Sequence, residues 1–321
     1  MKDKKFMKNK KLLNIFKNQS VFLALIIFAM ILIISSINKR FLSTTNIFAI
    51  LQQISVLGIA TMAATMLLKS SLFDLSSSGI ISLTCVMVAK FITDGMDTTL
   101  AAFIGLASSL AMGALNGIII SKTKTLPLII TLGMQYIYSG IALVLTGGVF
   151  IGLKGKFSYL GNGKILGIPV SVIVFFIVVV IVSIVLEWTR YGRRLVAIGN
   201  NPEAAYLSGI DVDKYTILNY MISGGVFGLA GLVLLSRLGS VISNVGAGYE
   251  LRSIASAIVG GVSVSGGKGS VFGAFLGVIL MGIISNGMNI LSISSYYQDI
   301  VLGILIVVAV IISNIKNMKA N

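Results

Sequence analysis

Residues 169–188 read PVSVIVFFIVVVIVSIVLEW, and the polar stretch that follows, residues 188–214, reads WTRYGRRLVAIGNNPEAAYLSGIDVDK. The first run is almost wholly apolar and about 20 residues long, which is the length that a helix needs to cross a bilayer. A second apolar run of similar length begins at residue 214. The alternation of apolar runs with polar loops therefore decides the fold class.

The same alternation fills the rest of the chain. Of its 321 residues, 56% are hydrophobic and 11% are charged, and the mean hydropathy is +1.00. A soluble domain could not bury so much apolar surface, so we predict a polytopic membrane protein. A shorter apolar piece at 251–262 suits a half-helix or re-entrant segment, which gives an all-α transmembrane helical bundle of about ten spans. The other expected spans are 20–38, 47–68, 74–93, 99–120, 126–147, 169–188, 214–236, 270–290 and 296–314.

The net charge of +15 invites a nucleic-acid interpretation, but the basic residues cluster at the chain ends and in short loops. That distribution is typical of topology signals, so we predict no nucleic-acid partner. If the N-terminus lies inside and the spans alternate, most of the 25 basic residues fall on the cytoplasmic side. We therefore expect a basic cytoplasmic N-terminus (1–19), a single transmembrane domain (20–314) with a cytoplasmic loop at 189–213, and a cytoplasmic tail (315–321).

A short helix is predicted within that loop. Pro202 begins a run that continues to Ser208, and Gly209 follows it. Proline in a first turn and glycine after a last turn suit a helix of about two turns. Such a helix is too short to span a bilayer and is marginal alone in water, so it needs a partner to pack against.

The motifs at 192–193, 197–201, 203–205 and 208–210 resemble, in order and type, the cytoplasmic coupling loop of sugar ABC importer permeases. These are the ribose-, galactose- and xylose-type members of the binding-protein-dependent transport family. An ordinary basic loop beside the membrane is the alternative interpretation of such short motifs. The resemblance implies docking onto an ATPase through Asn201, Pro202, Glu203, Ala204, Ala205, Ser208 and Gly209.

Further motifs extend the resemblance over about 54–310. Residues 127–134 read PLIITLGM, and the glycine-rich series from 246 to 287 follows the family order and spacing. The resemblance implies a permease subunit in a bacterial plasma membrane that translocates a monosaccharide or similar small polyol. Its partners would be separate ATPase subunits, an extracytoplasmic sugar-binding protein, membrane lipid, and a second permease, either a copy or a paralogue. The sequence departs from the family pattern in two places, at residues 70–79 (SSLFDLSSSG) and at Arg252, where the family has an anion. Both departures would be tolerated if the partner were a second, different permease.

Polar side chains within the apolar segments are candidates for the substrate pathway. A neutral polyol would be held by amides and hydroxyls, while hydrogen bonds between helices are the alternative role for each such residue. Asp74 begins an apolar helix, where it either caps the free amides of the first turn or contacts substrate. The amides considered as a set also include Gln53 and Gln135. The predicted pathway residues are Asp74, Ser76, Gln52, Asn116, Asn286 and Asn289.

Residue types that commonly act in catalysis or bind metals are scarce, since the chain has no histidine and a single cysteine, Cys85. We therefore predict no metal site, no bound cofactor and no enzymatic activity. The glycine-rich stretch at 261–269, GVSVSGGKG, lacks the Gly and the Ser or Thr that a phosphate-binding loop requires. ATP and Mg²⁺ would then be bound by the partner ATPase. The remaining alternative is a secondary transporter or channel for a small neutral solute.

Overall fold

The computed structural model describes residues 19–294 and, beyond them, positions 297, 298, 300, 301, 303, 304, 307, 308 and 311. The predicted N-terminal segment 1–19 therefore lies almost wholly outside the described residues, as do much of the span at 296–314 and the whole tail at 315–321.

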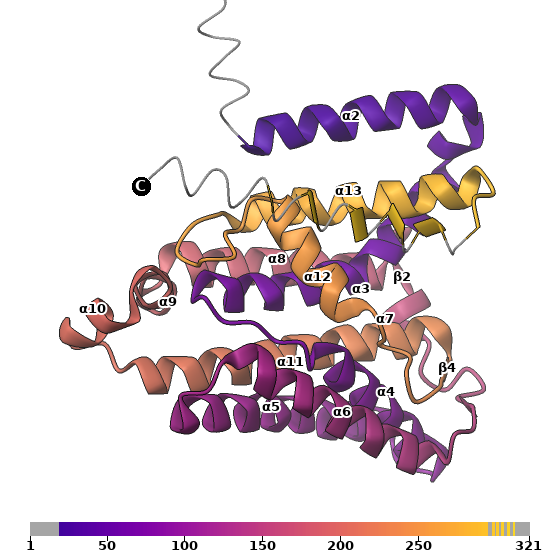
Figure 1. Cartoon of the computed structure of the whole chain (residues 1–321). Coiled ribbons are helices and arrows are strands. Elements are labelled where there is room, and N and C mark those ends of the chain that lie inside the picture. The colour runs from indigo at the N-terminus through magenta and orange to yellow at the C-terminus, as the bar shows by residue number, and fades with distance from the viewer. Residues whose placement is uncertain are drawn as a thin grey trace, which may run out of the picture.

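Helices carry the fold (Figure 1). The longer ones run roughly parallel or antiparallel, in layers that place α2 and α13 at one side of the molecule and α5 and α6 at the other. The described helices are α2 (Gln19–Ile37), η1 (Lys39–Leu42), α3 (Thr44–Lys69), α4 (Ser77–Thr93), α5 (Thr98–Thr123), α6 (Pro127–Thr146), α7 (Tyr159–Asn162), α8 (Val170–Ser183), η2 (Ile184–Trp188), α9 (Arg190–Asn200), α10 (Pro202–Leu207), α11 (Val212–Leu238), α12 (Tyr249–Val259) and α13 (Val271–Ile290).

Four two-residue strands form two small antiparallel pairs in the described region. Strand β1 (Ile151–Gly152) pairs with β4 (Ser240–Val241), and β2 (Lys164–Ile165) pairs with β3 (Ile168–Pro169). The β1–β4 pair ties the α6–α8 connection to the end of α11, and the β2–β3 pair lies within that connection. This face of the molecule is called the strand end below, and the opposite face, which carries α9 and α10, is called the α10 end (Figure 1).

Short polar side chains mark where the apolar helices begin. The side chain of Ser43 accepts a hydrogen bond from the amide of Asn46 at the start of α3, and Ser270 does the same for Gly273 at the start of α13. Asp97 accepts from two amides at the start of α5. Each oxygen satisfies an amide that has no partner inside its helix, which matters most where water is scarce.

Seven described helices are long and apolar enough to cross a membrane. These are α2, α3, α5, α6, α11, α13 and the continuous Val170–Trp188, in which α8 runs into the π-helical turn η2. Helix α4 is apolar but shorter, with 17 residues, and α12 has 11 residues, as expected for a half-helix near 251–262. The chain is thus a mostly helical, multi-pass membrane protein, and the predicted count of about ten spans is not confirmed.

Glycines set the closest helix crossings. Helix α11 packs against α5 with so little space that a Cβ on Gly113 would lie 2.2 Å from the carbonyl oxygen of Tyr220. At the crossing of α12 and α13, a Cβ on Gly277 would lie 2.0 Å from the carbonyl oxygen of Ser256. In lipid, apolar helices gain little from hydrophobicity, so this close backbone approach supplies the contact energy. Glycines therefore allow the closest backbone contacts at these two crossings.

Candidate functional site

The predicted coupling helix is α10. It begins at Pro202, and the side chain of Asn201 caps it by accepting a 3.0 Å hydrogen bond from the amide of Ala204. It ends at Leu207, and Gly209 adopts a φ of +80°, which allows the chain to turn away. The hydroxyl of Ser208 donates to the carbonyl oxygen of Ala204 at 2.8 Å. The coupling candidates 201–205, 208 and 209 therefore form one compact element.

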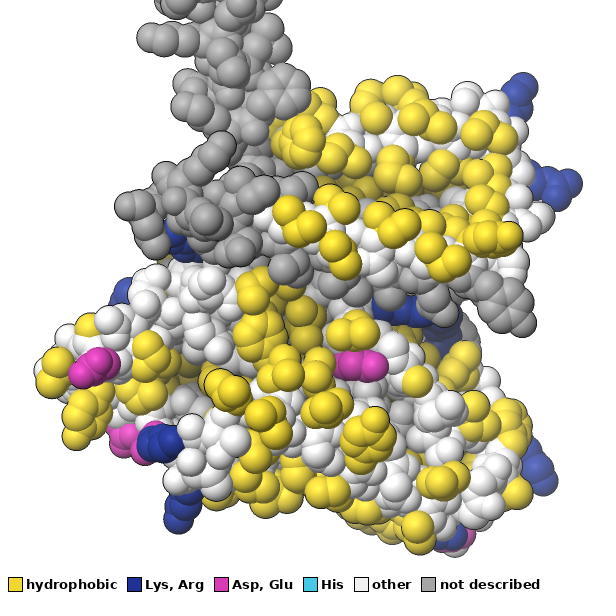
Figure 2. Space-filling model, viewed as in Figure 1, with side chains coloured by type: hydrophobic (Ala, Val, Ile, Leu, Met, Phe, Trp, Pro, Cys, Tyr) yellow, Lys and Arg dark blue, Asp and Glu magenta, His cyan; other side chains and the backbone are white. Residues whose placement is uncertain are grey.

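This element projects from the α10 end and exposes an apolar surface. Tyr206 is 69% exposed and Leu207 is 79% exposed, whereas Ala205 is buried against the rest of the protein. Glu203 is also exposed on the same helix. In Figure 2 the protruding end carries hydrophobic and acidic side chains next to one another. Large apolar side chains that protrude from a polar loop are typical of a protein-binding surface.

Backbone contacts hold α9 against the α10 end of α3. The hydroxyl of Ser71 lies 3.0 Å from the carbonyl oxygen of Gly199 and 2.7 Å from that of Ser265. The amide of Gly267 donates to the carbonyl oxygen of Lys69 at 3.0 Å. We call the residues 69–71, 199 and 265–267 the clamp. The clamp joins α3, α9 and the loop between α12 and α13.

Charged and aromatic contacts complete the attachment of this end. Lys124, after α5, forms an ion pair with Asp213 in the first turn of α11. Arg194 of α9 donates to the hydroxyl of Tyr215, and its guanidinium carbon lies 5.2 Å from the centre of the Tyr215 ring. At the α10 end, helix α11 is therefore linked both to α5 and to α9.

Three of the predicted pathway residues meet in one cluster. Asp74 is buried, and its Oδ1 accepts from the amide and the hydroxyl of Ser76 at 2.8 and 2.6 Å. The side-chain amide of Asn116 donates to the Ser76 hydroxyl oxygen at 2.7 Å, and the Tyr138 hydroxyl donates to the Asn116 side-chain oxygen at 3.0 Å. We call these four residues the Asp74 cluster.

The expectation that Asp74 caps the next helix is wrong in detail. Helix α4 starts at Ser77, and the residue in the capping position is Ser76, whose side chain makes no capping hydrogen bond. Asp74 instead accepts a hydrogen bond from the amide of Ser76, one residue before the helix, because residues 70–76 form turns and irregular structure between α3 and α4. The other carboxylate oxygen, Oδ2, is buried without a hydrogen-bond partner.

The remaining predicted pathway residues lie elsewhere. Gln52 donates to a carbonyl oxygen in α7 at 3.5 Å, near the strand end. Asn286 and Asn46 exchange two hydrogen bonds of 3.0 Å between α13 and α3. Asn289 accepts from the side-chain amide of Gln298 at 2.7 Å. The six predicted residues therefore do not form a single site, and hydrogen bonding between elements accounts for most of their contacts.

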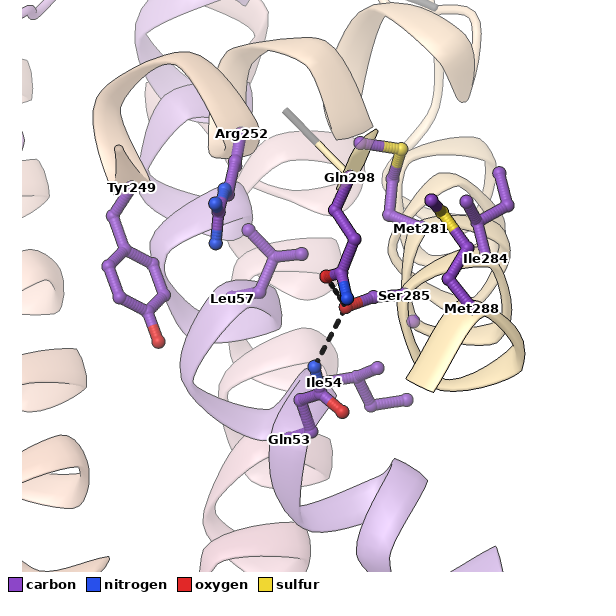
Figure 3. A pocket seen from close by; sticks show the side chains of 11 residues that line it. Gln53, Ile54, Leu57, Tyr249, Arg252, Met281, Ile284, Ser285, Met288 and Gln298 are labelled. Atoms are coloured by element: carbon purple, nitrogen blue, oxygen red, sulfur yellow. Dashed lines mark hydrogen bonds between the residues drawn. The ribbon is translucent and has the colours of Figure 1, made fainter. Parts of the chain in front are cut away.

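A pocket lies between α3, α12 and α13 (Figure 3). It has an empty volume of about 650 Å³, which includes space that is open to solvent. None of the six predicted pathway residues lines it. Its polar lining residues are Gln53, Tyr249, Arg252, Ser285 and Gln298.

Polar groups on one side of this pocket are connected. The side-chain amide of Gln53 donates to the hydroxyl oxygen of Ser285 at 3.0 Å, and that hydroxyl lies 3.3 Å from the side-chain oxygen of Gln298 (Figure 3). Arg252 enters from α12 and is the one charged residue among the described residues that line the pocket. The apolar wall consists of Ile54, Leu57, Met281, Gly282, Ile284 and Met288.

The sequence pointed to this pocket only in part. Gln53 belonged to the amide set, and Arg252 attracted notice as a departure from a family motif, but Tyr249, Ser285 and Gln298 were missed. One signal was present, because Met281, Ser285 and Met288 recur at helical spacing and so share one face of α13. That pattern does not reveal which neighbour the face meets.

Residues 46–310, which begin within α3 and include most of the described chain, match the family described as "Branched-chain amino acid transport system / permease component". The chain belongs to this family. The family resemblance drawn from the loop and glycine motifs is thereby confirmed, because similar curated members are sugar import permeases.

Three relatives illustrate how much of the permease is shared. It is 37% identical over 294 residues to the "Ribose import permease protein RbsC" of Bacillus subtilis, with 91% of each chain covered. It is 39% identical over 274 residues to the "D-allose transport system permease protein AlsC" of Escherichia coli, with coverage of 85% of this chain and 84% of the relative. It is 32% identical over 320 residues to the "Galactose/methyl galactoside import permease protein MglC" of Salmonella typhimurium, with coverage of 94% and 95%. No solved structure matched the chain.

Proposed function

We propose that this chain is the membrane-spanning permease subunit of an ATP-binding cassette importer for a monosaccharide or similar small polyol. The observation that carries the proposal is the near full-length similarity to permeases named for ribose, allose and galactose import. The exposed helix α10 follows directly after α9, which the clamp holds, and this arrangement supports a subunit that another protein moves.

The pocket favours a sugar over the amino acid that the family description mentions. A free amino acid carries an ammonium and a carboxylate, and burying an ammonium without a negative partner is costly. No carboxylate lies among the described residues that line the pocket. Its amides, hydroxyls and arginine instead suit the hydroxyl groups of a neutral sugar, and its methionines and aliphatic side chains suit the C–H faces of a ring.

Helix α10 is the proposed docking site for an ATPase subunit. Its exposed Tyr206 and Leu207 would enter a groove on the ATPase, and Glu203 would fix the orientation. ATP and Mg²⁺ would be bound and hydrolysed by that partner, so this chain would not itself be an enzyme. A binding partner can shift the equilibrium between two conformations only if it binds them with different affinity. The ATPase must therefore bind α10 differently before and after hydrolysis.

We further propose an orientation for the permease in the membrane and a set of partner proteins. Residues 20–314 would form a single transmembrane domain in a bacterial plasma membrane, with the loop at 189–213 and both termini in the cytoplasm. Lys69, Lys124 and Arg194 gather at the α10 end, which supports this side as cytoplasmic. A sugar-binding protein would dock at the strand end, and a second permease, identical or different, would complete the pathway.

Reconstitution tests this function. The permease is placed in proteoliposomes with its ATPase and binding protein, and uptake of labelled D-ribose, D-allose, D-galactose and L-leucine is measured with and without ATP inside. ATP-dependent accumulation of at least one sugar, without leucine, is expected. Uptake of leucine alone would contradict the sugar assignment.

Cysteine labelling tests the orientation. Cys85 is the single cysteine and is buried, so a cysteine introduced at Glu203 reports its own accessibility. In intact cells it should resist a maleimide that cannot cross membranes, and it should react once the membrane is opened. Reaction in intact cells would place α10 outside and overturn the coupling role.

An ion-coupled carrier is the second candidate, and the buried Asp74 with its unpartnered oxygen is the observation that favours it, because ionisable groups at membrane depth often mark ion pathways. Uptake by the permease alone, driven by an imposed pH gradient without an ATPase, would support this candidate. Dependence on the ATPase would exclude it.

A further inference from the structure

Within the proposed sugar import, we infer that the pocket between α3, α12 and α13 holds one neutral sugar in transit, with Arg252 and the Gln53–Ser285 pair as the groups that contact its hydroxyls. This inference depends on the proposed function. It assigns the contact site to residues that lie apart from the Asp74 cluster and from the pairs made by Gln52, Asn286 and Asn289.

The pocket has a firm wall on the side of α3 and α13. A Cβ on Gly282 would lie 2.0 Å from Cγ2 of Ile54, so these helices touch along the base of the pocket. The hydrogen bond from Gln53 to Ser285 joins the same two helices beside this contact, although the residues are 232 positions apart in the sequence. Polar groups held in this way lose little freedom when a ligand binds.

The polar wall offers the groups that a polyol requires. Each hydroxyl of a sugar both donates and accepts, and a glutamine side chain supplies two donors and an acceptor. Gln53 uses one donor on Ser285, so its side-chain oxygen can accept from a sugar hydroxyl. An arginine fork presents donors only, at fixed angles, which suits two neighbouring hydroxyl oxygens.

Arg252 is placed by the geometry at the start of α12. Gly248 precedes the helix with a φ of +86°, and a Cβ there would lie 3.6 Å from Nε and 3.8 Å from Cζ of Arg252. The arginine side chain therefore folds back over the glycine toward the pocket (Figure 3). A Cβ at position 248 would therefore lie in ordinary van der Waals contact with this guanidinium.

Helix α12 also connects the pocket to the coupling element. Its first turn carries Tyr249 and Arg252, and its last residue is followed by the loop that the clamp holds against α9. At that end a Cβ on Gly273 would lie 2.1 Å from the carbonyl oxygen of Gly260, so α12 and α13 are closely packed. Movement of α9 would then alter the position of Arg252 relative to the Gln53–Ser285 pair, and with it the hold on the sugar.

Protection of an introduced cysteine tests the pocket directly. Met288→Cys places a thiol in the pocket lining, and Met281→Cys is a second position if the first does not assemble. In the reconstituted complex, D-ribose, D-allose or D-galactose should slow modification by a small thiol reagent about fivefold, as expected for groups that hold a ligand through hydrogen bonds. A cysteine at the exposed Tyr136 in α6 serves as the control and should show no protection.

Arg252→Gln and Gln53→Ala should each reduce this protection and lower the number of sugars imported per ATP hydrolysed by about fivefold, while ATP hydrolysis stays within about twofold. Gly140→Ala, at an exposed position in α6 with no atom near the new Cβ, should leave both readouts unchanged. ATP-dependent sugar uptake without any protection at positions 281 and 288 would overturn the pocket but not the proposed function. Protection by D-ribonate and not by D-ribose would overturn the neutral-sugar assignment. No uptake by the wild-type complex would overturn the function itself.

Discussion

Gly199→Ala should separate ATP hydrolysis from transport. Gly199 lies near the C-terminal end of α9, and a Cβ there would sit 2.1 Å from the carbonyl oxygen of Lys69 and 2.9 Å from the amide nitrogen of Gly267. Ordinary contact begins at 3.4 Å, so α9 must move from α3 by about 1.3 Å. Both neighbours are backbone atoms, which cannot rotate away as a side chain would.

The displacement has a calculable cost. The hydrogen bond from the Ser71 hydroxyl to the carbonyl oxygen of Gly199 is 3.0 Å long, and a shift of this size takes it beyond hydrogen-bonding distance. One lost hydrogen bond corresponds to about 1 kcal/mol, at the lower end of the range of about 1–3 kcal/mol for overpacking a tight contact. Because α10 itself is unchanged, the ATPase should still bind. The link from α9 to the α12–α13 loop should weaken.

The assay compares sugar uptake with ATP hydrolysis in the same proteoliposomes. In Gly199→Ala, hydrolysis should continue, while the sugar imported per ATP should fall by about fivefold or more, the equivalent of 1 kcal/mol or more of lost coupling. Gly140→Ala is the matched control, because Gly140 is an exposed helical glycine in α6 with no atom near its Cβ position. Normal import per ATP in a correctly assembled Gly199→Ala complex would refute the transmitting role of the clamp.

Three further predictions concern α10 and the Asp74 cluster. Glu203→Lys should abolish uptake and ATPase binding in co-purification without reducing membrane insertion, and retained binding would argue against the docking role of α10. Asn201→Ala removes the cap of α10 and should destabilise that helix by about 1 kcal/mol, seen as faster amide exchange at 203–207; unchanged exchange would mean that the cap is unimportant. Asp74→Asn keeps an oxygen for Ser76 and lies outside the pocket lining, so uptake should fall only modestly; a severe loss in a well-folded protein would return Asp74 to the pathway.

The sequence predicted the long helices well because hydropathy alone defines them. The expected span at 126–147 corresponds to α6, that at 270–290 to α13, and that at 47–68 to the middle of α3. Apolar residues end where the bilayer would end, and serine, proline or glycine marks the boundary. The non-helical residues 74–76, which lie inside the expected span 74–93, were not foreseen, because a short break between apolar runs does not change the average hydropathy of a window.

The residues that shape the coupling helix are close together in the sequence, whereas those that shape the pocket are far apart. Asn201, Pro202 and Gly209 shape α10 within a single short stretch, so the sequence alone was sufficient to predict its start and its end. The pocket depends on how α3, α12 and α13 are rotated about their axes, and that rotation is decided by packing contacts such as Gly282 against Ile54. Hydropathy carries little information about rotation when a helix is apolar on all sides.

The same difference bears on how such a permease can change its substrate. Because α10 and the clamp rely on local capping and on backbone atoms, substitutions at Gln53, Arg252 or Ser285 leave them untouched. Pocket residues can therefore vary while the coupling element stays constant, which fits a family whose members are named for ribose, allose, fructose and galactose. Exchanging Arg252 should then alter which sugar is imported without altering how the ATPase binds, whereas exchanging Gly199 should lower the import per ATP of every sugar alike.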